Sequence, residues 1–157
     1  MAAGSTYTPI ATTTTSGSSY TFSSIPSTYT DLVVVFSGTN ASNTGIQFTL
    51  NSDTGSNYSY TQIYGDGTSA ASNRNTTYSS YAYIGTSQSV AIFQFMNYSN
   101  TSAYKTTLYR GNNPGSAVNA GVGLWRSTSD INQIAFTTFA GTNFSNTQIT
   151  LYGIQAA

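Results

Sequence analysis

Hydrophobic and polar side chains alternate with a period of two along most of this chain. The segments 46–52, 89–98 and 131–138 show the pattern clearly, with β-branched and aromatic residues in alternation with polar ones. No stretch of about ten residues carries the hydrophobic stripe and the capping residues of a helix. The pattern therefore predicts an all-β chain with no significant helix.

Clusters of Gly, Asn, Ser and Pro separate the alternating segments and are typical of turns. Short strands at this spacing predict an antiparallel β-sandwich, jelly-roll-like, with about 8–11 strands. The count leaves room for an N-terminal edge strand and an extra hairpin. The expected strands are 7–14, 19–25, 31–37, 46–52, 58–64, 76–84, 89–98, 104–110, 118–125, 131–138 and 147–154.

One strand differs from the others because its hydrophobic residues are continuous from Leu32 to Phe36. Such a run predicts a central strand with both faces covered, and Asp31 at its end discourages edge-to-edge pairing. The segments 65–67, 111–115 and 140–143 are expected to be turns or loops, because Gly and Asn accept positive φ.

The chain has 157 residues, which is the length of about one domain. No linker or change of composition divides it, so residues 1–157 are expected to form a single β-sandwich domain, with 1–18 as an N-terminal edge strand or arm. Because there is no cysteine, the fold has to rest on sheet hydrogen bonds, packed aromatic rings or contacts between subunits.

Charge is scarce: the chain has four Lys or Arg and four Asp, and no Glu, His or Cys. Acid–base catalysis, nucleophile activation and transition-metal binding draw mainly on the missing residue types. The composition therefore predicts a protein that is not an enzyme and has no catalytic residue, cofactor or metal. A net charge of zero favours association instead.

The few charged residues give little support for a metal site, a catalytic site or nucleic-acid binding. Segment 51–57 has the alternating oxygen side chains of a calcium loop but is better explained as a turn, and Asp53 and Asp66 lack the acidic surroundings of a glycosidase pair. The four basic residues form no cluster, so no nucleic-acid partner is expected. Neither a membrane span nor an export signal is evident, and no membrane partner is expected.

Aromatic residues are the better candidates for function, with thirteen Tyr, eight Phe and one Trp. Tyrosine buries a large ring and still hydrogen-bonds at its tip, so it suits protein interfaces and sugar platforms. About half of the rings are expected in the core, and Trp125 is expected to be a packing anchor rather than a ligand stacker. The candidates for an interface or a glycan site are Tyr58, Tyr60, Tyr64, Tyr78, Tyr81, Tyr83 and Trp125.

A set of short motifs, ordered along nearly the whole chain, resembles a family of small structural proteins from the virions of tailed phages, especially marine and cyanobacterial ones. The motifs are 10–12, 22–32, Phe48 with 51–59, 123–128 with Ile131, and 151–154. The resemblance implies a part of the virion, assembled in the host cytoplasm, that is either a capsid decoration (cement) protein or a fibre component. It supplies no catalytic residues.

The sequence favours decoration over a fibre, because it has no heptads, no collagen-like glycine period and no long repeat. The expected partners are further copies of the chain, as a homotrimer, and the major capsid protein or another virion protein. The alternatives are a tail or head fibre module that binds host surface glycans and an unrelated extracellular adhesin or lectin domain.

Overall fold

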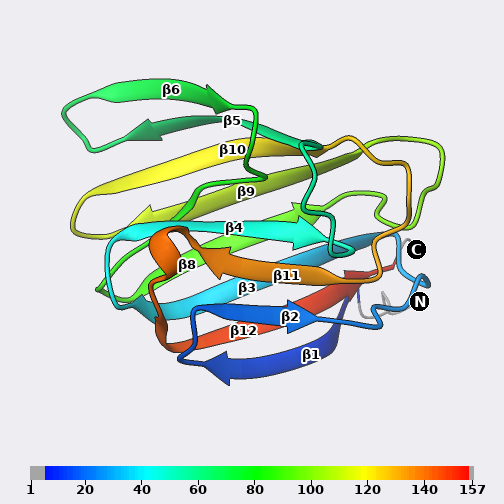
Figure 1. The fold of residues 1–157 in the computed structure, drawn as a ribbon. Coiled ribbons are helices and arrows are strands. Elements are labelled where there is room, and N and C mark those ends of the chain that lie inside the picture. The colour runs from blue at the N-terminus through cyan, green and yellow to red at the C-terminus, as the bar shows by residue number, and fades with distance from the viewer. Residues whose placement is uncertain (1–5, 156–157) are drawn as a thin grey trace.

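The computed structural model of this chain describes residues 6–155 as two antiparallel sheets packed face to face (Figure 1). The only helical element described is one short 3-10 turn, η1 (Phe139–Gly141). The twelve strands are β1 (Tyr7–Thr15), β2 (Ser19–Phe22), β3 (Asp31–Asn40), β4 (Thr44–Leu50), β5 (Tyr58–Gly65), β6 (Ala70–Asn75), β7 (Ala82–Ile84), β8 (Ser89–Phe95), β9 (Lys105–Asn113), β10 (Ala117–Trp125), β11 (Ile134–Thr138) and β12 (Phe144–Ile154).

The larger sheet has eight strands in the order β1-β12-β3-β8-β9-β10-β5-β6, and the smaller has four in the order β2-β11-β4-β7. Successive strands switch repeatedly between the sheets, so neighbours in space are distant in sequence, as in β12 and β3. The predicted all-β antiparallel sandwich is confirmed. The jelly-roll assignment stays a prediction; the hairpins β5–β6 and β9–β10 both belong to the larger sheet.

The core lies between the sheets and consists largely of phenylalanine rings. Phe36 of β3 packs edge-on against Phe93 of β8 and against Phe136 of β11, with ring centroids 5.7 and 4.9 Å apart. All three side chains are fully buried. Burying a side chain of this size contributes about 1.5–3 kcal/mol. This shared core fixes the two sheets against each other.

Most predicted strands are present, and their ends differ by a few residues. The arm predicted for 1–18 is the edge strand β1, paired with β12, while residues 1–5 lie outside the described part. The predicted turn at 111–115 was placed too early, because β9 continues to Asn113 and the chain turns back between there and Ala117.

The strand count of 8–11 was too low, because the prediction missed β6. Its six residues are almost all exposed and show no hydrophobic alternation. A turn creates this strand: Asp66 Oδ1 accepts hydrogen bonds from the backbone N–H groups of Thr68 (2.8 Å) and Ser69 (2.7 Å), and Gly67 has a φ of 89°. The chain therefore folds back, and β6 pairs along β5.

The predicted strand 76–84 is a strand only at β7. Before it, the Ser79 hydroxyl donates to the carbonyl of Phe48 (2.6 Å) and accepts from the same residue's N–H (2.9 Å), while the Ser80 hydroxyl donates to the Ile46 carbonyl (3.0 Å). Serine side chains thus replace the backbone ladder beside β4. This segment packs against the core-facing side of the larger sheet, beyond the edge of the smaller sheet.

Candidate interaction surfaces

The seven aromatic candidates divide between the core and a partly exposed cluster. Tyr58, Tyr60 and Trp125 are 3–6% exposed and belong to the core. Tyr58 and Trp125 stack with ring centroids 6.4 Å apart, so Trp125 packs as predicted. The Tyr58 hydroxyl accepts a hydrogen bond from the Leu50 N–H (2.9 Å), and burial raises the pKa of Tyr58 to about 12. These three side chains support the fold.

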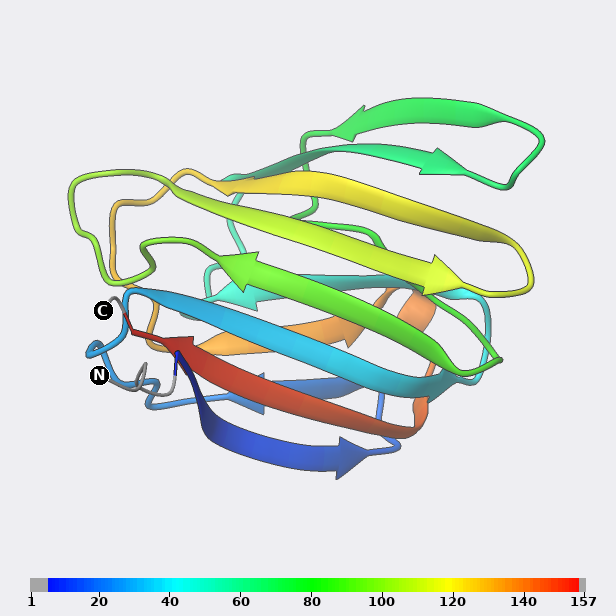
Figure 2. The same cartoon turned by 180° about the vertical axis from the view of Figure 1, so that it is seen from behind.

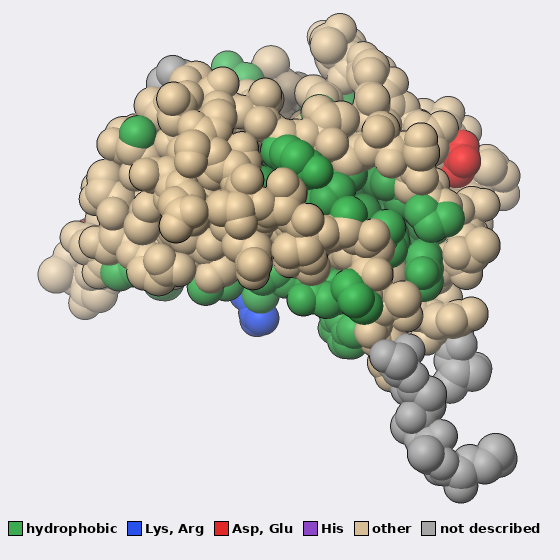
Figure 3. Space-filling view, turned by 90° about the horizontal axis from the view of Figure 1, so that it is seen from below, with side chains coloured by type: hydrophobic (Ala, Val, Ile, Leu, Met, Phe, Trp, Pro, Cys, Tyr) green, Lys and Arg blue, Asp and Glu red, His purple; other side chains and the backbone are tan. Residues whose placement is uncertain are grey.

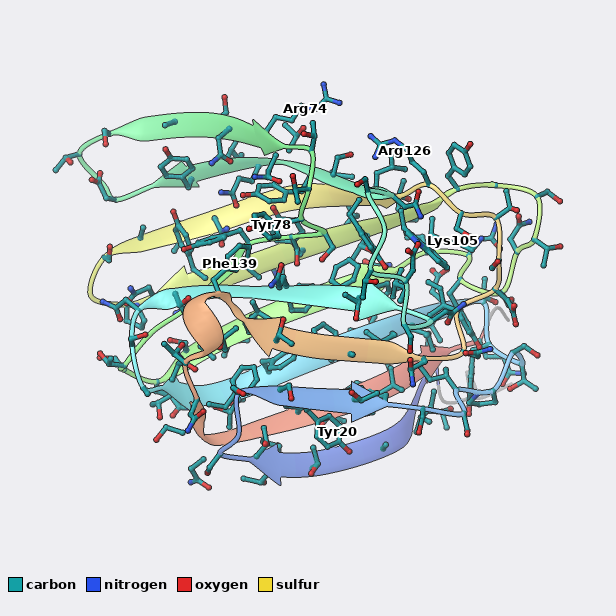
Figure 4. The ribbon with its side chains drawn as sticks, in the orientation of Figure 1. Tyr20, Arg74, Tyr78, Lys105, Arg126 and Phe139 are labelled. Atoms are coloured by element: carbon teal, nitrogen blue, oxygen red, sulfur yellow. The ribbon has the colours of Figure 1, made fainter. Side chains whose placement is uncertain are left out.

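The other four candidates lie together near η1. Tyr64 packs against Tyr83, Tyr83 against Tyr81, Tyr81 against Phe139, and Phe139 against Tyr78, with ring centroids between 4.5 and 6.4 Å apart. We call this set the ring ladder. Figure 4 shows Tyr78 beside Phe139 over the smaller-sheet side of the molecule. Tyr78 is 40% exposed and is the accessible end of the ladder.

The loop after β4, which the sequence predicts to be a turn rather than a calcium site, is closed by hydrogen bonds to Asp53. Asp53 accepts hydrogen bonds from Trp125 Nε1 (2.6 Å), Asn57 Nδ2 (2.8 Å) and the backbone N–H of Gly55 (2.8 Å). The bonds from Trp125 and Asn57 hold the pKa of Asp53 below its usual value. The carboxylate is occupied by the protein itself, and it ties this loop to β10.

The single lysine is also structural. Lys105 is 3% exposed, and its Nζ donates to the carbonyl oxygens of Ala103 (2.9 Å) and Thr128 (3.1 Å). Burial lowers the pKa of Lys105. The remaining basic side chains are three arginines: Arg110 lies within the surface described next, Arg74 lies opposite Thr61 at the β6 margin of the same face, and Arg126 donates to the Ser59 hydroxyl (2.9 Å).

The outer face of the eight-stranded sheet is hydrophobic, and the sequence analysis did not predict this surface. Figure 2 shows this face with no described element in front of it. Alternate residues of β3 point to opposite faces: Leu32, Val34 and Phe36 enter the core, and Val33 and Val35 point outward. Val33 is nevertheless 6% exposed and Val35 is half-buried, so neighbouring side chains cover this strand on both faces, as predicted, although no further layer lies over the outer face in the described part of the chain.

Strand register extends this face in rows across the sheet. One row places side by side Val35, Ile92, Arg110, Ala120 and Ile63. The next row, two residues further along each strand, consists of Val33, Gln94, Leu108, Val122 and Thr61. Seen from below, hydrophobic side chains continue along the margin of the molecule, with a basic group projecting among them (Figure 3).

This outer face is hollowed into what we call the trough. One hollow of about 950 Å³ lies between the β5–β6 hairpin and β8, and a second of about 690 Å³ reaches from β5 to β1 and β3. The two hollows share Ile63, Ile92, Arg110 and Ala120. Six of the nine exposed large hydrophobic side chains line them, namely Tyr7, Ile63, Val90, Leu108, Val118 and Val122.

The opposite surface of the sandwich has a different chemistry. The smaller sheet turns outward a row formed by Thr21, Ala135 and Thr49, and next to it a row formed by Ser19, Thr137 and Gln47. These side chains are small or polar. The larger sheet therefore exposes a broad hydrophobic face, of the kind that marks a binding surface in a soluble protein, and the smaller-sheet side combines these polar rows with the ring ladder.

A signal for the trough was present in the sequence. The expected strands 31–37 and 104–110 carry hydrophobic residues at both parities, as in Leu32–Phe36 and in Leu108 next to Tyr109, where a half-exposed strand carries them at one. This pattern indicates two hydrophobic faces but does not say whether the protein itself covers both. The order of strands in space decides that, and it leaves this face without a layer of its own.

Comparison with models of known protein families found no match, and a search of curated proteins found none either. Within residues 6–155 no three His, Cys, Asp or Glu side chains are grouped so that they could hold a metal ion. The described elements include no helix with the length and hydrophobicity needed to cross a membrane. The likeness to phage structural proteins stays a prediction from the sequence.

Proposed function

We propose that this chain is a non-enzymatic structural protein of a phage particle and that it decorates the outer surface of the head. The observation that carries the proposal is the trough, a broad hydrophobic face on a nearly uncharged sandwich. A protein of this kind attaches by buried area and needs no reacting group. The motif resemblance, which implies a virion protein, supports the same proposal.

The positions of the carboxylates support a role without catalysis. Asp31 accepts a hydrogen bond from the Asn97 N–H (2.6 Å), Asp53 holds the loop after β4, and Asp66 forms the β5–β6 turn. Each of these three is used by the fold. We therefore keep the proposal of a structural protein that assembles with itself, as a trimer, and with a capsid protein.

The second candidate is a fibre module that binds a host surface glycan, and the ring ladder favours it. Tyr78 presents an exposed ring whose partner Phe139 holds it in place. Flat aromatic faces of this kind suit the stacking of a sugar ring. A glycan array with the wild-type chain and Tyr78→Ala tests it: binding that the variant loses supports the fibre.

Copy number separates the two candidates. Quantitative mass spectrometry of purified particles compares this chain with the major capsid protein. Decoration of a lattice requires copies in proportion to the capsid subunits, and a fibre requires a small fraction of that number. Labelling with an antibody against the chain then places it on the head or on the tail. A chain absent from particles would refute both proposals.

A further inference from the structure

The trough has the shape of a groove with a floor and two walls. Strands β8, β9 and β10 form the floor, the β5–β6 hairpin forms one wall through Ala70 to Ser72, and the other wall includes Tyr7 of β1 with Val33 and Val35 of β3. A face of eight strands about 4.8 Å apart and about nine residues long spans roughly 30 Å in each direction. The trough occupies part of that face, over β3, β5, β6, β8, β9 and β10 with Tyr7 of β1.

Arg110 is the one charged residue that lines the trough, and both hollows include it. Its side chain is exposed, and its guanidinium forms no hydrogen bond or ion pair with any described residue, while its backbone pairs with β8 and β10. Its neighbours across the strands are Ile92 and Ala120. A guanidinium in hydrophobic surroundings is complementary to a carboxylate, which it binds through two parallel hydrogen bonds.

A second copy of this chain fits the trough poorly. Two troughs placed face to face would oppose two hollow surfaces and bring two Arg110 side chains toward each other, and like charges placed together across an interface are unfavourable. The opposite sheet presents Ser, Thr and Gln side chains, which do not match a hydrophobic groove. The occupant has to be convex, largely hydrophobic and acidic at one point.

We propose that the trough binds an amphipathic helix of another protein, with one carboxylate in its hydrophobic stripe that pairs with Arg110. A helix about 10–12 Å across is a rod of the right form for an open groove with two walls. The inference rests on the proposed function, because it takes the trough as the attachment surface, and it adds the chemistry of the partner.

Synthetic peptides test this chemistry directly. The probe is an 18-residue helical peptide with a leucine stripe and one central Glu, compared with versions that carry Gln or Lys there. Titration calorimetry with the full chain should show the Glu peptide binding at least about tenfold more tightly than the other two. Arg110→Gln should abolish this preference, and Arg74→Gln, a control on the edge strand β6, should keep it.

A third variant tests whether peptide binding requires the hydrophobic lining of the trough. Ile63→Asp, at a side chain that is 66% exposed, should weaken binding of every peptide and leave the thermal unfolding midpoint unchanged. Equal affinity for the three peptides, or no binding by any of them, would overturn the proposal. So would binding of dodecanoate without binding of the peptide, which would assign the trough to a lipid.

Sedimentation tests the last alternative occupant of the trough, a second copy of the chain. A dimer that Ile63→Asp dissociates would assign the trough to a second copy of the chain and overturn the helix proposal. The proposed function fails on a different result, the absence of the chain from particles, which leaves the peptide preference intact. The two proposals can therefore fail independently.

Discussion

Asp53 shows how one of the few charged residues is used. Its carboxylate receives the indole N–H of the buried Trp125 and the amide of Asn57, and so joins the loop after β4 to the end of β10. The oxygen-rich composition of this loop was visible in the sequence. The partner was not, because Trp125 lies 72 residues away along the chain.

Replacing Asp53 with asparagine should destabilise the protein. Oδ2 of Asp53 accepts from both Trp125 and Asn57, and Oδ1 accepts from the Gly55 N–H, so an asparagine oxygen at the Oδ2 position would keep the first two bonds and lose the third. The bonds that remain would also lose their charged acceptor, and a hydrogen bond to a charged group contributes about 1.5–3 kcal/mol where a neutral one contributes about 0.5–1.5 kcal/mol. Urea unfolding at neutral pH measures the loss. Asp66→Asn is the matched control, because every hydrogen bond found for that side chain uses Oδ1, which asparagine retains.

The same residue predicts a dependence on acid. The pKa of Asp53 is lowered in the folded state, mainly by the hydrogen bond from Trp125. The ionised form therefore stabilises the fold above its ordinary pKa of 3.8, and this stabilisation is lost as the pH falls through the lower folded value. Wild-type stability should decline below about pH 4 more steeply than that of Asp53→Asn. Parallel curves for the two proteins would contradict the assignment.

At the scale of elements, glycine lets β7 and the segment before it lie directly on the larger sheet. A Cβ atom at Gly123 of β10 would lie 2.3 Å from the Ser79 carbonyl oxygen, and one at Gly111 of β9 would lie 2.5 Å from the backbone of Tyr83. These close approaches let a segment with little strand pairing cover the inner face of two strands. They also explain how the larger sheet extends beyond the smaller one.

Gly123→Ala should therefore separate β10 from this segment. Forcing a methyl group into a packed site costs about 1–3 kcal/mol, and here the obstructing atom belongs to the backbone and cannot turn aside. Thermal unfolding should show a lower midpoint for this variant. Gly115→Ala serves as the control, because its nearest neighbour, Asn113 Oδ1, would be 4.0 Å from the new Cβ. If both variants unfold at the same temperature, the packing role of Gly123 is refuted.

Prediction from sequence succeeded for strands in which hydrophobic and polar residues alternate. Alternation located ten of the twelve described strands to within a few residues, placed β7 at the end of a longer segment, and gave the all-β class, because side-chain period follows directly from strand geometry. It failed at β6, which exists through the Asp66 turn, and at Ser79 and Ser80, whose hydroxyls replace backbone pairing. It found the tyrosines of the ring ladder and missed the trough, because only the spatial order of strands shows which hydrophobic face stays open.

At the scale of the whole molecule, the sandwich is divided into a hydrophobic face and a polar face. The division lies across the two layers, since the larger sheet carries the trough and the smaller sheet carries Thr, Ser and Gln. A particle protein with this arrangement has one surface for attachment and one for water. In the proposed attachment, buried hydrophobic area supplies the affinity and Arg110 contributes a single ion pair.

Attachment to particles should therefore resist salt. In about 1 M NaCl the Debye length falls to about 3 Å, which screens exposed ion pairs but leaves hydrophobic burial intact. The chain should stay with pelleted particles after such a wash. Ile63→Asp, which buries an unpaired charge in the trough, should lower the bound fraction by at least about tenfold. Thr21→Asp on the polar face is the matched control and should bind normally. Release of the wild-type chain by salt alone would show that exposed charges, and not the trough, hold it to the particle.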